Sequence, residues 1–167
     1  MCYIKQEKDS PMELKIGQKA PDFILPANNN SEIALSDYKS QFLVLYFYPK
    51  DNTPGCTKEA LDFSENIEEF TKLNTSVVGI SKNTPTKHDK FIEKNSLKLS
   101  LGSDIDGRVI NNYGAWIEKN MYGKKYMGIE RLTILIGPGN EILQIWRKVR
   151  VKDHVKKVLE ELKKHIL

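Results

Sequence analysis

The sequence predicts an α/β fold with a mixed central sheet flanked by helices. In the first half of the chain, apolar runs of strand length alternate with segments of helical periodicity. In the second half, two strand-like runs are separated by a Gly-Pro-Gly-Asn turn and followed by an amphipathic helix. Strand-helix-strand order favours parallel pairing and a tight turn favours antiparallel pairing, so we expect both in one sheet.

The length and composition indicate one globular domain. A chain of 167 residues has the size of an ordinary domain, and we expect this domain over residues 12–167 behind a flexible N-terminal tail over residues 1–11. With 40% hydrophobic and 29% charged residues, the chain has no apolar run near the roughly 18 residues that a bilayer requires, so we expect no membrane span. Lysines scattered among acidic residues account for the net charge of +4, which argues against nucleic-acid binding.

Cysteine usage limits the chemistry further. Two cysteines, Cys2 and Cys56, cannot form a disulfide framework, and with three separated histidines they do not make a zinc site. We therefore expect no metal. The lack of a secretory signal, together with the few cysteines, favours the cytoplasm.

The first β-α-β unit begins at residue 42. Residues 42–48 form a continuous apolar run, typical of a central strand that is covered on both faces. Residues 56–73 contain neither proline nor glycine and are expected to form one helix. Its apolar face carries Cys56, Ala60, Phe63, Ile67 and Phe70. Residues 76–81 predict the second strand, and Thr84 followed by Pro85 predicts the start of the next helix.

The second half predicts a hairpin and a last helix. Residues 131–136 and 141–149 are the two strand-like runs on either side of the turn. From residue 152 onward, apolar residues recur at helical spacing: Val155, Val158, Leu159, Leu162 and Ile166. This order of elements resembles the thioredoxin-like fold.

The three histidines, His88, His154 and His165, lie among lysines on predicted helices, so we expect them on the solvated surface.

The stretch FYPKDNTPGC, residues 47–56, ends on Cys56 at the start of a predicted helix. Only a thiolate is a strong nucleophile, and the unpaired N–H groups of a helix N-terminus favour an anion. Pro49 ends the preceding strand, and Thr53 can act as the N-cap. The alternatives are a buried cysteine that only packs, and a dithiol exchange enzyme. The second is disfavoured because Thr53 stands where a Cys-x-x-Cys pair needs its first cysteine.

The spacing Pro49-x-x-x-Thr53-x-x-Cys56 resembles the active-site motif of the peroxiredoxins. The longer stretch YFYPKDNTPGCTKEA is similar to the peroxiredoxin Q, or bacterioferritin comigratory protein, subfamily. The likeness continues over residues 12–25, 113–116, 122–131 and 145–152. The resemblance implies a thiol-dependent peroxidase of thioredoxin-like fold that reduces hydrogen peroxide and organic hydroperoxides, is a monomer and uses no cofactor.

The resemblance also implies a role for each site residue. Cys56 is the peroxidatic cysteine and becomes a sulfenic acid. Thr53 hydrogen-bonds the peroxide, Pro49 shields the sulfenic acid, and Arg131 holds the thiolate and the peroxide. A guanidinium suits that task because it is always charged and presents several fixed donors.

The usual resolving cysteine of this subfamily lies five residues after the peroxidatic one, where this chain has Leu61. Five helical residues correspond to a turn of about 140° away from the apolar face, so we expect a partly exposed leucine. The sulfenic acid must then be reduced by an external thiol such as thioredoxin or glutaredoxin with glutathione, or by Cys2. We favour a one-cysteine enzyme. Cys2 as resolver, and Met12 as the true start of the chain, remain alternatives.

A different class of protein also fits these residues. A binding or chaperone-like module could keep the fold and lose turnover with the resolving cysteine. A working peroxidase should lose its Cys56 thiol rapidly to peroxide, whereas such a module should react no faster than free cysteine.

Overall fold

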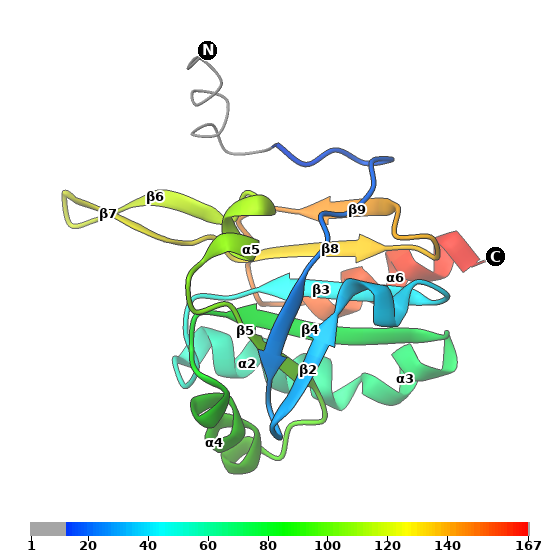
Figure 1. Cartoon of the computed structure of the whole chain (residues 1–167), viewed down its shortest axis with the longest axis horizontal. Coiled ribbons are helices and arrows are strands. Elements are labelled where there is room, and N and C mark those ends of the chain that lie inside the picture. Colours follow the sequence, from blue (N-terminus) through cyan, green and yellow to red (C-terminus); the bar gives the residue numbers. More distant parts are fainter. Residues whose placement is uncertain (1–12, 167) are drawn as a thin grey trace.

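The computed structural model, which describes residues 13–166, contains a seven-stranded mixed sheet in the order β2-β1-β5-β4-β3-β8-β9 (Figure 1). Its strands are β1 (Ile24–Ala27), β2 (Ser31–Ala34), β3 (Phe42–Phe47), β4 (Thr75–Ser81), β5 (Ser100–Ser103), β8 (Leu132–Ile136) and β9 (Ile142–Trp146). β3, β4 and β5 run parallel, and the remaining pairs are antiparallel. The predicted mixed sheet is confirmed.

Strand β3 is an inner strand of the sheet, since it pairs with β4 on one side and with β8 on the other. Its side chains alternate between two buried clusters. Leu43, Leu45 and Phe47 belong to one cluster, and Val44 and Tyr46 to the other. Both faces of β3 are therefore buried, which explains why residues 42–48 form a continuous apolar run, as the sequence predicted.

Helices cover both faces of the sheet. They are η1 (Leu35–Tyr38), α2 (Pro54–Glu65), α3 (Ile67–Lys72), α4 (Pro85–Asn95), α5 (Arg108–Asn112) and α6 (His154–Ile166). α2, α3, α4 and α6 contribute to the cluster that contains Tyr46, whereas α5 and η1 contribute to the cluster that contains Phe47. Thr84 caps α4 as predicted, because its hydroxyl accepts a hydrogen bond from the backbone N–H of Lys87 at 3.2 Å.

The prediction of one helix over residues 56–73 is wrong at Asn66, which separates α2 from α3. The side-chain amide of Asn66 donates to the carbonyl of Asp62 at 2.8 Å, taking the acceptor that its backbone N–H would use in a continuous helix. That N–H bonds to Phe63 O instead. A side chain therefore ends the helix where periodicity alone showed no break.

The second strand of the predicted hairpin is shorter than residues 141–149, since β9 ends at Trp146. Lys148 has a φ of 48°, and its N–H donates to the Glu130 carboxylate at 2.8 Å. A left-handed residue whose N–H is bonded to a side chain does not continue a strand. The hairpin itself is confirmed.

The prediction that all three histidines are solvated is wrong for two of them. His88 and His154 are buried, with 0% and 4% of their surface exposed, whereas His165 is exposed. Successive helical residues point in different directions. His88 therefore shares the inner face of α4 with Phe91 while Lys87 and Asp89 point outward. Flanking lysines were a poor guide for this reason.

Strands β6 (Trp116–Met121) and β7 (Lys124–Ile129), which the sequence did not predict, form a separate two-stranded sheet. This β6–β7 arm extends away from the main sheet (Figure 1). The β1–β2 hairpin and β5 were not predicted either.

Three other expectations concern Leu61, a membrane span and the N-terminal residues. Leu61 is partly exposed, as predicted. Within residues 13–166, no helix is long and apolar enough to cross a membrane. Cys2 and the domain boundary expected at Met12 lie outside the described residues.

Candidate active site

The loop between β3 and α2 places Cys56 in the first turn of a helix. Thr53 is the N-cap with extended backbone, Pro54 is the first helical residue and Cys56 the third. The backbone N–H groups of Gly55 and Cys56 therefore belong to the set that has no partner within the helix. Only 1% of the surface of Cys56 is exposed, so the thiol lies below the surface at the positive end of α2.

Arg131 lies against this thiol. Its Nη2 donates to Cys56 Sγ at 3.5 Å. The antiparallel register explains the approach, since Leu132 pairs with Phe47 and the preceding Arg131 falls where β3 ends and the loop begins. Gly55 leaves the necessary space, because a Cβ at that position would lie only 3.2 Å from Arg131 Nη2.

The other two predicted site residues lie on the same loop. The Thr53 hydroxyl donates to the carbonyl of Lys50 at 3.2 Å and makes no hydrogen bond to the helix, so Thr53 is an N-cap by position only. With its proton used in this way, the hydroxyl oxygen still has lone pairs to accept another hydrogen bond. Pro49 is half-buried at the start of the loop.

Glu59 is a site residue that the sequence analysis missed. It lies one turn after Cys56 and is fully buried, and its Oε1 accepts from Arg131 Nη1 at 2.7 Å. Burial raises the pKa of the Glu59 carboxyl to about 7, against the opposing effect of Arg131. The available signal was an acidic residue three positions after the cysteine, on the same helical face.

A second cation, Lys119 on β6, interacts electrostatically with the charged groups of the site. Partial burial lowers the pKa of Lys119, as does the charge of Arg131, whereas the Cys56 thiolate acts in the opposite direction. Gly128, on the neighbouring strand, leaves room for the lysine chain, because a Cβ there would lie 3.3 Å from Lys119 Cδ. The ammonium is therefore within electrostatic reach of the thiol. Nothing in the local sequence indicated this.

A buried tyrosine borders the same groups. Tyr46 stacks on Phe63 with ring centroids 4.7 Å apart, and within the described chain its hydroxyl has no hydrogen-bond partner. Burial raises the pKa of Tyr46 well above its ordinary value, and the charges of Glu59 and Cys56 add to this effect. Tyr46 is thus an uncharged wall of the site.

These groups surround one thiol with positive charge. The helix N-terminus, Arg131 and Lys119 all favour an anion, both for a thiolate and for the oxygen anion that leaves when a thiolate attacks a peroxide. Across residues 13–166, no cluster of three or more His, Cys, Asp and Glu side chains is arranged to hold a metal ion. The arrangement suits nucleophilic chemistry at sulfur.

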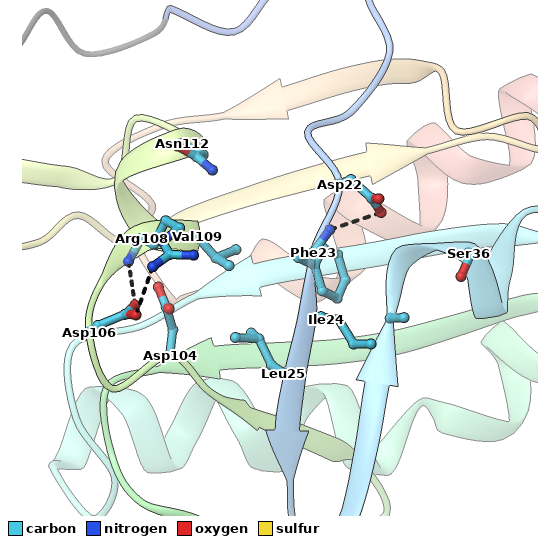
Figure 2. A pocket seen from close by; sticks show the side chains of 11 residues that line it. Asp22, Phe23, Ile24, Leu25, Ser36, Asp104, Asp106, Arg108, Val109 and Asn112 are labelled. Carbon is cyan, nitrogen blue, oxygen red and sulfur yellow. Dashed lines mark hydrogen bonds and ion pairs between the residues drawn. The ribbon is translucent and has the colours of Figure 1, made fainter. Parts of the chain in front are cut away.

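A separate pocket lies between β1 and the segment that leads into α5 (Figure 2). Its acidic groups are already used within the protein. Asp104 accepts from the backbone N–H of Ile110 at 2.7 Å, and Asp106 forms an ion pair with Arg108 at 3.6 Å. None of the residues around Cys56 lines this pocket, so it is not part of the site.

Comparison with known proteins agrees with this geometry. Residues 16–145 match the model of the AhpC/TSA family. Peroxiredoxin Bcp of Bacillus subtilis (strain 168) is 46% identical over 152 residues, covering 91% of this chain and 97% of the relative. Peroxiredoxin Bcp of Escherichia coli (strain K12) is 39% identical over the same shares of the two chains.

Solved structures show the same likeness. A structure of Xanthomonas campestris bacterioferritin comigratory protein superposes with a TM-score of 0.83 at 39% identity, covering 87% of this chain and 92% of that one. A cysteine-to-serine mutant of Xylella fastidiosa PrxQ gives a TM-score of 0.86 at 39% identity, covering 91% and 97% of the two chains. The chain therefore belongs to the AhpC/TSA family, in which it is a peroxiredoxin of the Bcp type and a thiol-dependent peroxidase.

Proposed function

We propose that this peroxidase reduces hydrogen peroxide and organic hydroperoxides through Cys56 and completes its cycle as a one-cysteine enzyme with an external thiol. The observation that carries the proposal is the 3.5 Å contact between Arg131 Nη2 and Cys56 Sγ at a helix N-terminus. The structure of the Xanthomonas campestris relative is described in terms of alkyl peroxide reduction activity, which supports including organic hydroperoxides.

The first half-reaction takes place at Cys56 Sγ. The thiolate attacks one peroxide oxygen, the O–O bond breaks, and the other oxygen leaves as hydroxide or alkoxide and takes up a proton to become water or an alcohol. The sulfur is oxidised to a sulfenic acid and the peroxide is reduced by the same two electrons. Arg131 stabilises the thiolate and the charge that moves onto the departing oxygen. Thr53 accepts the peroxide O–H, and Pro49 shields the product from water.

The second half-reaction requires a thiol from outside the described site. A donor thiol attacks the sulfenic sulfur, water leaves, and a mixed disulfide forms; a second donor thiol then releases Cys56. Leu61 occupies the position where a resolving cysteine would stand. Thioredoxin, or glutaredoxin with glutathione, is the class of donor that fits this chemistry, because both are thiol reductants.

We also propose that the enzyme acts as a cytoplasmic monomer. Cys56, Arg131, Glu59 and Thr53 all come from one chain, so this constellation requires no second copy. A reducing compartment keeps thiol donors available. Analytical ultracentrifugation of the reduced protein tests the monomer, and a larger species at working concentration would contradict it.

The experiment that tests the cycle is peroxide consumption by the wild type and by Cys2→Ser and Cys56→Ser variants. Thioredoxin, glutaredoxin with glutathione, and dithiothreitol serve in turn as reductant. We expect turnover to be lost only in Cys56→Ser, and the active donors to name the recycling partner. A quantitative Cys2–Cys56 disulfide after peroxide treatment, seen by mass spectrometry, would contradict the one-cysteine cycle. Its absence, together with turnover by Cys2→Ser, supports the cycle.

A further inference from the structure

A buried polar hub centred on Asp51 lies beside the active-site loop. Asp51 is 7% exposed and belongs to the loop between β3 and α2. Its Oδ1 accepts from the Tyr48 hydroxyl at 2.6 Å, and its Oδ2 lies 2.8 Å from His88 Nδ1. Its backbone N–H donates to Asn83 Oδ1 at 2.8 Å. Asp51 thus links the active-site loop to the start of α4, through Asn83 and His88, and to Tyr48 three positions earlier in the chain.

His88 connects this hub to the sheet. Its ring is completely buried, with Nδ1 facing Asp51 and Nε2 lying 3.0 Å from the carbonyl oxygen of Gly102 on β5. Both ring nitrogens therefore face oxygen atoms of neighbouring groups, which fixes the orientation of the ring. A buried carboxylate is costly unless it is paired, and here it is paired with His88 and also accepts from Tyr48.

The hub lies immediately before the start of α2. Only Asn52 separates Asp51 from the N-cap Thr53, and Asn52 has a φ of 67°. The chain therefore turns sharply between the anchored Asp51 and the first turn of α2. Displacing Asp51 would displace Thr53, and with it the N-terminal groups that surround Cys56.

The two halves of the proposed cycle make opposite demands on this loop. Peroxide attack needs the thiolate held against Arg131, whereas reduction needs the sulfenic sulfur to meet the thiol of another protein. A sulfur atom of a residue that is 1% exposed is out of reach of a protein-sized donor. The loop and the first turn of α2 must therefore move outward for recycling, which rests on the external-thiol cycle proposed above.

We propose that Asp51, held by His88 and Tyr48, is a positioning residue that keeps the loop closed for peroxide attack and limits how fast Cys56 becomes accessible to a protein thiol. The hub acts through the position of the loop and touches neither the peroxide nor the sulfur. Weakening it slows oxidation and speeds access, so the two rates change in opposite directions. A purely structural loss would not produce this pattern.

The test uses two variants of Asp51 and a matched control, all in a Cys2→Ser background. Asp51→Ala removes both side-chain hydrogen bonds. Asp51→Asn keeps the shape of the side chain and an oxygen that accepts from Tyr48, and it places an amide in front of His88 Nδ1 in place of the carboxylate. Asp104→Ala is the control, because Asp104 is a buried carboxylate, 1% exposed, that accepts from the backbone N–H of Ile110 in α5, away from the active-site loop.

Three measurements are made on each protein. Stopped-flow kinetics gives the rate of Cys56 oxidation by hydrogen peroxide. Labelling with a small maleimide and with one attached to a large polymer gives the size-dependent access to Cys56. Hydrogen exchange by mass spectrometry gives the opening of residues 48–57.

We expect Asp51→Ala to oxidise about 10-fold more slowly, because a small misplacement of reacting groups costs rate on that order. Its labelling by the polymer reagent should be roughly 5-fold faster and residues 48–57 should exchange faster, as local opening becomes easier. Asp51→Asn should lie between Asp51→Ala and the wild type. Asp104→Ala should match the wild type in all three measurements while losing stability.

Parallel slowing of oxidation and labelling in Asp51→Ala, or values equal to those of Asp104→Ala, would overturn the proposal. If Asp51→Ala does not fold, the same comparison is made with Asp51→Asn. Hydrogen exchange, oxidation and labelling rates of Asp51→Asn equal to those of the wild type would then overturn the proposal. Exchange and labelling need no reductant. A failure of every donor to recycle the wild type would therefore contradict the proposed cycle. The exchange and labelling measurements would still test the role of Asp51.

Discussion

The guanidinium of Arg131 contacts Cys56 Sγ at 3.5 Å although the two residues are 75 positions apart in the sequence. The same guanidinium bonds to Glu59 Oε1 at 2.7 Å, one helical turn after the cysteine. Arg131 is therefore held by two groups of one helix and has little freedom to turn away from the sulfur. This geometry supplies the positive charge and the directed donors that peroxide cleavage requires.

Replacing Arg131 with lysine should lower the rate of Cys56 oxidation by hydrogen peroxide by roughly 10²-fold, the usual scale for losing a positioned donor. Lysine keeps the charge but loses the planar fork that serves Cys56 and Glu59 together. Stopped-flow fluorescence under single-turnover conditions measures the rate. Arg147→Lys is the control, since Arg147 also pairs with a buried carboxylate, that of Glu130, and should retain the wild-type rate. Equal rates in the two variants would contradict the role of Arg131.

The pKa of Glu59 predicts a pH dependence of its own. Burial raises this pKa from 4.5 to about 7, so the folded protein keeps a proton that the unfolded chain releases. Stability from this group is present below about pH 4.5 and is lost as the pH rises toward 7. In the oxidation rate we expect a step near pH 7, because ionised Glu59 offsets part of the charge of Arg131.

The variant Glu59→Gln keeps the hydrogen bond to Arg131 and removes the titration. Its oxidation rate should show no step near pH 7. Its free energy of unfolding should increase relative to that of the wild type as the pH rises to about 8. Glu59→Ala should oxidise about 10-fold more slowly at every pH, since Arg131 loses its anchor. Stopped-flow profiles and urea denaturation at several pH values check both outcomes. A step that persists in Glu59→Gln belongs to another group.

Removing the charge of Lys119 should reduce the oxidation rate roughly threefold at low ionic strength, as expected for a partly screened charge near the thiolate. Lys119→Gln is compared with Lys124→Gln, a change of an exposed lysine on the same β6–β7 arm. The difference between the two variants should disappear in high salt. Indistinguishable rates at low salt would show that the ammonium of Lys119 does not act on Cys56.

His154 should make the protein less stable in acid. Burial, followed by the charges of Lys157 and Arg131, lowers the pKa of His154 from 6.5 to about 4. Between these values the unfolded chain binds a proton that the folded chain does not, so stability falls as the pH drops from 6.5 to 4, by up to about 3 kcal/mol. Denaturation of His154→Gln should show a smaller loss. His165→Gln, which changes an exposed histidine, should follow the wild type.

The local sequence predicted the strands and helices whose pattern is set by neighbouring residues. The apolar run of β3 is visible because both faces of that strand are buried, and Thr84-Pro85 marks the start of α4 because capping is a local hydrogen bond. The break at Asn66 could not be predicted from periodicity, since it depends on whether a side chain or the backbone takes one carbonyl. The short β1, β2 and β5 carry too few residues for a clear pattern.

The residues of the candidate site also fall into two groups, those predicted from the sequence and those found only in the tertiary structure. The sequence by itself predicted that Cys56 starts a helix after a proline-containing loop. The motif it shares with the peroxiredoxins pointed to Thr53 and Pro49, and the wider resemblance to that family pointed to Arg131. Only the tertiary structure decided that Glu59 anchors Arg131, that Lys119 reaches the site from the β6–β7 arm, and that His88 is buried against Asp51. The physical reason is that helix starts and turns are governed by neighbouring residues. The surroundings of a charge are governed by which distant segments the sheet register brings together.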